Sequence, residues 1–117
     1  MESVQQRIKA VESRITSIRE MISAGQKSEA QELFRDLKAH LDAEYRRMSP
    51  AKAEAKLSAV ERAFYLPFIQ DAWANTGISG VRWNSDPAKW RDALWSISDY
   101  VGYWTASLNE QVADNSV

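Results

Sequence analysis

The stretch 90–108 reads WRDALWSISDYVGYWTASL. Apolar side chains recur along it in steps of four, three, four, three and four residues, at Trp90, Leu94, Ile97, Val101, Trp104 and Leu108. This spacing keeps them on one side of an α-helix and is typical of a helix that packs against other helices. Asp86 and Pro87 precede the stretch as an N-cap and a first-turn proline. We therefore predict a helix over about 87–108, as the last helix of a bundle.

The opposite side of this predicted helix carries two more large aromatic residues. Trp95 and Tyr103 point more than a third of a turn away from the apolar stripe, and Asp99 lies between them on the same side. A buried aromatic side chain removes roughly 150–250 Å² from water. Leaving two of them exposed would forgo several kcal/mol at about 25 cal/mol per Å². We expect another part of the chain, a second copy or a partner protein to cover them.

The N-terminal residues predict a first helix over about 3–24. The four-three spacing continues through Val4, Ile8, Val11, Ile15, Ile18 and Ile22. Gly25 is a natural residue for ending this helix. A narrow stripe of β-branched residues is also used by oligomeric coiled coils. The favoured interpretation is nevertheless that it packs on helices of its own chain, because short connections usually produce helical hairpins.

A second helix is predicted over about 29–48. Ser28 and Gln31 have the spacing of a capping box. Its buried stripe is expected to contain Ala30, Phe34, Leu37, Leu41, Tyr45 and Met48. Ser49 and Pro50 end it, since the residue before proline avoids the α region.

A third helix is predicted over about 50–75, with an apolar face of Ala53, Leu57, Val60 and Phe64. Pro67 lies inside it. Proline donates no backbone hydrogen bond, and its ring presses on the carbonyl four residues earlier, so we expect a kink there. A loop over 76–85 and a polar, frayed tail over 109–117 complete the chain. The sequence as a whole predicts one all-α domain over 1–117, a four-helix, mostly antiparallel bundle with a kinked third helix.

Composition and charge exclude several functional classes. The 117 residues fit a single domain, and the formal net charge of −1 argues against general binding to nucleic acid or anionic membranes. The absence of cysteine removes disulfides, thiolate metal sites and cysteine nucleophiles, and it fits a cytoplasmic location. The longest apolar run, 63–69, is too short to cross a bilayer, and the N-terminus does not resemble a signal peptide.

The only histidine, His40, lies four residues from both Asp36 and Glu44. Such spacing places all three on one strip of a helix, where histidine and carboxylates can bind a metal. Charged residues at this spacing are common on helices, so local pairing on a solvated face is the favoured interpretation. We predict no metal site and no cofactor. The sequence also lacks the GxSxG, Walker A, GxGxxG and HExxH patterns.

Two functional hypotheses remain. The first is a non-enzymatic interaction module that self-associates or docks on a partner protein through Trp95, Tyr103, Asp99 and Arg91, since tryptophan, tyrosine and arginine dominate interface hot spots. The second is a small-molecule pocket near the Pro67 kink and the 76–85 loop. Its predicted lining is Tyr65, Asp71, Trp73, Arg82 and Trp83, with Arg82 as the expected ion-pair partner of Asp71.

Overall fold

The computed structural model describes residues 3–48 and 57–115 (111–115 as backbone). Within these ranges the chain forms no strand and four packed α-helices: α1 (Val4–Ser23), α2 (Lys27–Arg47), α4 (Leu66–Ala74) and α5 (Arg91–Asn115). Shorter turns are the π turn η2 (Glu61–Tyr65) and the 3₁₀ turns η3 (Ile78–Gly80) and η4 (Pro87–Trp90). The predicted all-α four-helix bundle is therefore confirmed.

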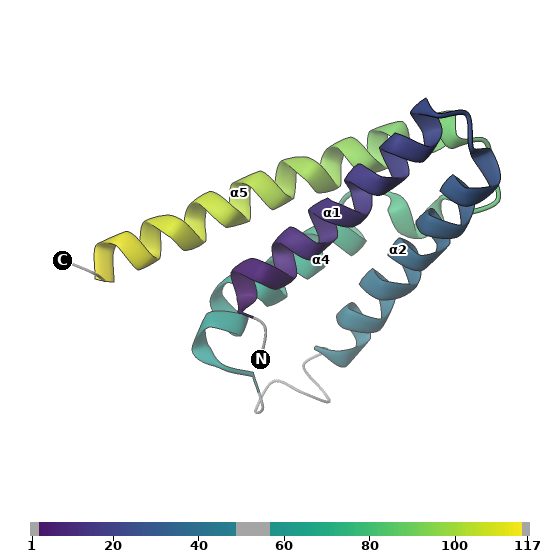
Figure 1. Cartoon of the computed structure of the whole chain (residues 1–117). Helices are drawn as coiled ribbons and strands as arrows, with labels where there is room; N and C mark the ends of the chain where they lie inside the picture. The colour runs from purple at the N-terminus through teal and green to yellow at the C-terminus, as the bar shows by residue number, and fades with distance from the viewer. Residues whose placement is uncertain (1–2, 49–56, 116–117) are drawn as a thin grey trace.

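Helices that follow one another in the sequence are neighbours in space. α1 packs against α2 and α5, and α4 packs against the same two helices, so the order around the bundle is α1, α2, α4, α5 (Figure 1). Arg19 of α1 contacts Ser98, and Gln5 contacts Asn109. α1 and α5 therefore run in opposite directions, as expected when short connections join the helices of a bundle.

The two ends of α1 are fixed by local hydrogen bonds that its sequence specifies. Ser3 and Gln6 form a reciprocal capping box, with N···O distances of 2.8 and 3.1 Å. At the other end Gly25 adopts a φ of 74°, which glycine reaches at little cost. The backbone N–H groups of Gly25 and Gln26 donate to carbonyls of the last turn at 3.1 and 2.9 Å, which is a Schellman motif.

The predicted capping box of α2 is wrong. α2 begins at Lys27, after Gln26, and no side chain caps it. The tight turn at Gly25 leads directly into this helix, so Ser28 already lies in the first turn. Gln31 points elsewhere, and its Nε2 donates to the backbone oxygen of Ser85 at 3.2 Å. This contact ties α2 to the segment that precedes α5.

The third helix begins later than predicted. Of the predicted 50–75, residues 50–56 lie outside the described residues, and Leu57 and Ser58 are not helical. Ser58 instead caps the helix. Its Oγ accepts from the N–H of Glu61 at 3.2 Å, and its own N–H donates to the Glu61 carboxylate at 3.1 Å. This Ser-x-x-Glu pattern is a capping signal that the sequence interpretation missed.

The distortion predicted at Pro67 is present as the π turn η2. The N–H of Leu66 donates to the carbonyl of Glu61, five residues earlier, in place of the usual four. Pro67 has no N–H for the carbonyl of Ala63, and its ring would clash with that group in a regular α-helix. The wider π turn relieves this clash and lets the chain continue as α4.

The final helix is longer than predicted. α5 continues to Asn115, so the predicted helix end at about 108 is wrong, while 116–117 lie outside the described residues. Figure 1 shows this end of α5 projecting beyond the other helices. An established helix extends by one hydrogen bond for each residue added, which explains why it passes the end of its neighbours.

The core lies between the four helices. Its fully buried large side chains are Trp90, Tyr65, Phe34, Phe68, Ile8, Ile15, Ile18, Leu37, Leu41, Met48, Ile69 and Ile78. Trp90 stacks on Phe34 with ring centroids 4.2 Å apart and planes 6° from parallel. Its Nε1 donates to Ser85 Oγ at 3.0 Å, so the buried indole keeps a polar partner.

Three residues predicted to be buried are exposed instead. Ile22 is 38% exposed, Tyr45 38% and Val60 46%. Each lies in the first or last turns of its helix, where the neighbouring helix offers less cover. The remaining described members of the predicted stripes in α1 and α2 are buried, whereas Ala53 lies outside the described residues.

Candidate docking surface on helix α5

The two most exposed large apolar side chains of the described residues are Trp95 and Tyr103. Trp95 is 65% exposed and Tyr103 is 61% exposed. Both belong to α5, whose other side is buried through Ala93, Leu94, Ile97, Val101 and Leu108. The helix therefore has a second apolar side that the described part of the chain leaves uncovered.

The contacts of α5 explain why this side faces outward. Ser98 accepts a hydrogen bond from Arg19 of α1 at 3.3 Å, so one flank of α5 lies on α1. Trp104 donates to Asp71 of α4 at 2.8 Å, so the other flank lies on α4. On a helical wheel the outward side lies between these two flanks, and both Trp95 and Tyr103 fall there.

Four exposed residues at steps of four form a continuous row along α5, namely Arg91, Trp95, Asp99 and Tyr103. We call this row the aromatic ridge. Among the described residues, Arg91 and Asp99 form no ion pair and no side-chain hydrogen bond. Tyr103 lies edge-on to the ring of Trp104, with centroids 5.0 Å apart and planes at 89°. The ridge thus carries one positive charge, one negative charge and two aromatic rings.

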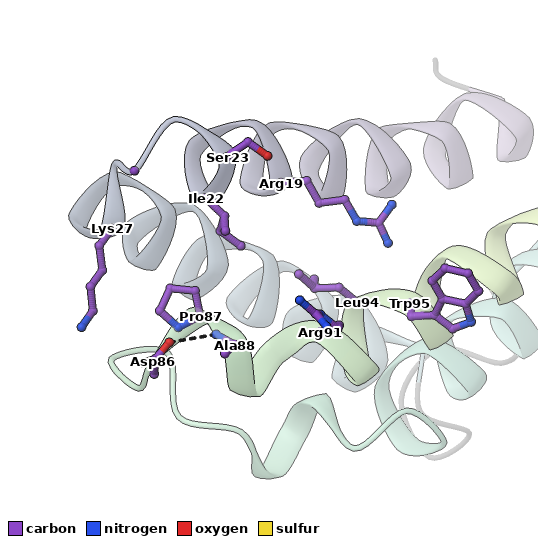
Figure 2. Close-up of a pocket in the computed structure, with 11 residues that line it drawn as sticks. Arg19, Ile22, Ser23, Lys27, Asp86, Pro87, Ala88, Arg91, Leu94 and Trp95 are labelled. Atoms are coloured by element: carbon purple, nitrogen blue, oxygen red, sulfur yellow. Dashed lines mark hydrogen bonds between the residues drawn. The ribbon is translucent and has the colours of Figure 1, made fainter.

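A groove adjoins one end of the ridge. It has a volume of about 680 Å³ and lies between the end of α1 and the beginning of α5. Figure 2 shows Ile22 and Arg19 of α1 on one side, with Leu94, Arg91 and Trp95 of α5 on the other. Arg91 and Trp95 belong to both groove and ridge, whereas Asp99 and Tyr103 do not line the groove.

The groove combines an apolar interior with positive charge. Its lining includes three cationic residues, Arg19, Lys27 and Arg91, and one carboxylate, Asp86. The carboxylate is already engaged, because its Oδ1 accepts from the N–H of Ala88 at 3.0 Å. The apolar stripe of α1 predicted Ile22 to be buried in the core, and therefore the sequence did not indicate this groove. Ile22 lies in the last turn of α1, just before Gly25 ends the helix, and residues at helix ends are covered by fewer neighbours.

None of the residues of the alternative pocket lines the groove beside the ridge. Asp71 accepts hydrogen bonds from Asn75 at 2.9 Å and Trp104 at 2.8 Å. Arg82 is exposed and forms no ion pair with Asp71. The expected ion pair between Asp71 and Arg82 is therefore wrong. The Asp71 carboxylate instead accepts hydrogen bonds from Trp104 and Asn75.

The three aromatic members of that pocket each contact a different part of the chain. Tyr65 is fully buried beneath the guanidinium of Arg7, which lies 3.9 Å from its ring centroid. Trp83 is partly exposed, and the centroid of its ring lies 5.2 Å from the guanidinium carbon of Arg35 on α2. Trp73 packs against the edge of the core. None of these residues lines the groove beside the aromatic ridge.

The strongest electrostatic cluster outside the ridge surrounds Tyr65. Arg7 forms an ion pair with Glu61 at 3.0 Å. Hydrogen bonds from Ser58 and Arg7 lower the pKa of the Glu61 carboxyl. Burial, together with the negative charge of Glu44, raises the pKa of Tyr65 to about 12. By distance and angle no described residue forms a hydrogen bond with the buried Tyr65 hydroxyl, although Glu44 and Arg7 lie close enough to act on its pKa. The cluster joins η2 to α1, and none of its residues lines the groove.

His40 is half-buried on α2. Burial and the positive charge of Arg14 lower its pKa, and Glu44 opposes them. Within residues 3–48 and 57–110, no three histidine or carboxylate side chains are grouped closely enough to hold a metal ion. None of the described helices is both long and apolar enough to cross a membrane.

No protein-family model, curated protein or solved structure matches this chain. Its function is therefore argued from the geometry of α5 and from the charges around it.

Proposed function

We propose that this chain is a non-enzymatic helical interaction module that self-associates or docks on a partner protein through the aromatic ridge. The observation that carries the proposal is the exposure of Trp95 and Tyr103 on a helix whose other side is already buried. Large aromatic residues side by side on a surface are a common feature of binding sites, because burying them against a partner releases free energy. The tryptophan, tyrosine and arginine of the ridge are the residue types enriched in hot spots.

The polar residues of the ridge support docking to a protein rather than to a bare apolar surface. Arg91 and Asp99 flank Trp95 on both sides along α5, and neither is paired within the described residues. Charged residues around an aromatic centre set the orientation and choice of partner. The non-enzymatic part of the proposal rests on the sequence, which lacks the common catalytic patterns. The absence of cysteine supports a cytoplasmic location for the module.

Site-specific photo-crosslinking tests the proposal. The photoreactive residue p-benzoylphenylalanine replaces Tyr103 in one variant and Tyr45 in the control variant. Tyr45 is an aromatic residue on α2 that is 38% exposed and lies outside the ridge. Irradiation of cells that express each variant should give covalent protein adducts from position 103 and far fewer from position 45. Adding Trp95→Lys to the Tyr103 variant should abolish the adducts.

The exchange of Trp95 must leave the fold intact for this result to count. Since Trp95 is mostly exposed, Trp95→Lys should preserve the circular dichroism spectrum and melting temperature. Equal adduct formation at positions 103 and 45, or none at either, would overturn the proposed function.

A further inference from the structure

The charges of the aromatic ridge are arranged with opposite sign on the two sides of Trp95. Arg91 lies four residues before Trp95, and Asp99 lies four residues after it. All three side chains are exposed. A row with this arrangement is complementary to itself when it is turned end to end. A surface that complements itself is the requirement for a two-fold symmetric interface.

We propose that a second copy of this chain occupies the ridge, with the two α5 helices antiparallel and the two-fold axis beside Trp95. This inference rests on the docking function proposed above and names its partner. In this register each residue lies opposite the residue equally far on the other side of Trp95. Arg91 then faces Asp99 of the second copy, and symmetry creates the same pair again.

The parallel arrangement is disfavoured by the same charges. It would place Arg91 opposite Arg91 and Asp99 opposite Asp99, and like charges in contact repel each other. The antiparallel arrangement instead places two ion pairs around two adjacent indole rings. Desolvation of these pairs by the rings strengthens them relative to pairs in open solvent.

The same register directs Tyr103 of the second copy towards the groove. Beyond Arg91 the row leads to the turn η4, so Tyr103 of the second copy lies towards η4, which contains Pro87. Pro87 lines the groove beside Arg91 and Trp95 (Figure 2). The exposed phenol ring of one copy is therefore directed towards the open groove of the other. Both exposed aromatic residues and the groove are used by one interface.

The geometry of the ridge also sets the strength that we expect. Rows of residues four apart are inclined to the helix axis, and two such rows pack when the helix axes cross at about 50°. Crossed helices touch over a short length, so the interface is small. Interfaces that bury less than about 1,200 Å² are characteristic of weak and transient association. The expected assembly is a monomer–dimer equilibrium that depends on protein concentration.

Charge exchange tests this register. Arg91→Asp places two pairs of like negative charges in the dimer, and Asp99→Arg places two pairs of like positive charges. In sedimentation equilibrium each single variant should have a dimer dissociation constant about tenfold or more above that of the unmodified chain. The double variant Arg91→Asp/Asp99→Arg restores both opposite-charge pairs and should dimerise within a few-fold of the unmodified chain.

Mixing the two single variants provides the sharpest result. One variant then carries two acidic residues on the ridge and the other carries two basic residues, so the mixed dimer contains both ion pairs. The mixture should associate more tightly than either variant alone, and salt should weaken it. A double variant or a mixture that associates no better than the single variants would overturn the proposed register.

The outcomes separate this inference from the proposed function. A Tyr103 adduct with twice the mass of the chain supports the second copy. Adducts of other mass only, or an unmodified chain that stays monomeric up to about 1 mM, overturn the second copy but leave docking on another protein intact. The absence of any adduct from position 103 overturns both.

Discussion

Trp104 of α5 donates a hydrogen bond from its indole Nε1 to Oδ2 of Asp71 on α4, at 2.8 Å. The other carboxylate oxygen accepts from Asn75 at 2.9 Å, one turn further along the same segment. Asp71 therefore connects two helices and satisfies the polar end of a half-buried indole. This structural link explains why a carboxylate lies near the apolar side of α4.

We predict that Asp71→Ala lowers the free energy of unfolding by about 1–3 kcal/mol, because it leaves the Trp104 indole without its acceptor. Urea denaturation followed by circular dichroism measures the loss. In a Trp104→Phe background the same substitution should have clearly less effect, because the donor is already absent. Equal losses in both backgrounds would show that the hydrogen bond does not contribute to stability.

Tyr65→Phe should raise the free energy of unfolding by about 1 kcal/mol at neutral pH. The hydroxyl is buried and has no hydrogen-bond partner among the described residues, so its removal relieves a desolvation penalty. The phenyl ring keeps the contact with Arg7, whose guanidinium lies 3.9 Å from the ring centroid. Tyr65→Ala serves as the comparison and should cost about 3–5 kcal/mol, because it empties a buried site.

Stability at alkaline pH should depend on the same residue. Burial raises the pKa of Tyr65 to about 12 in the folded chain, whereas the unfolded chain ionises near 10. The unfolded state therefore loses a proton first, and the stabilisation is lost as the pH rises from about 10 to about 12. The stability advantage of Tyr65→Phe should grow over this interval in urea titrations. A constant difference between the two proteins would contradict the raised pKa.

Glu61→Gln should destabilise the chain by about 1 kcal/mol at neutral pH. The carboxylate accepts hydrogen bonds from the N–H of Ser58 and from Arg7, and these lower its pKa. A lowered carboxyl pKa stabilises the fold above the usual value of 4.5, and this stabilisation is lost as the pH falls through the folded pKa. Urea midpoints of the two proteins should therefore converge as the pH falls below 4.5 and through the lowered pKa. If the urea midpoints still differ at low pH, the loss of stability comes from the changed side-chain packing and not from the lost negative charge.

Gly102→Ala should raise the free energy of unfolding by about 0.5–1 kcal/mol, because alanine loses less backbone entropy in a helix and its Cβ finds open space. Ala106→Gly, at an exposed position on the same helix, should produce a loss of similar size. Thermal and urea denaturation measure both changes.

The sequence by itself determined the local structure of much of the chain. The stripe from Val4 to Ile18 predicted α1, and Gly25 predicted its end, because periodicity and capping act within a few residues. Pro67 predicted a distortion since the missing N–H is a property of the residue itself. The errors in local structure have local causes too. The Ser58 cap was overlooked, and α5 continues past the polar residue Asn109 because helix extension needs no apolar partner.

Only the tertiary structure decided which side chains meet. The contact of Asp71 with Trp104, and the opening of a groove at Ile22, depend on the rotation and axial offset of helices that are distant in the sequence. A periodic pattern fixes which side of a helix is apolar, but it does not specify the neighbour or how far that neighbour extends. The apolar pattern predicted that Trp95 points away from the core. Its exposure to solvent depends on the positions of the other helices, none of which packs over it in the described fold.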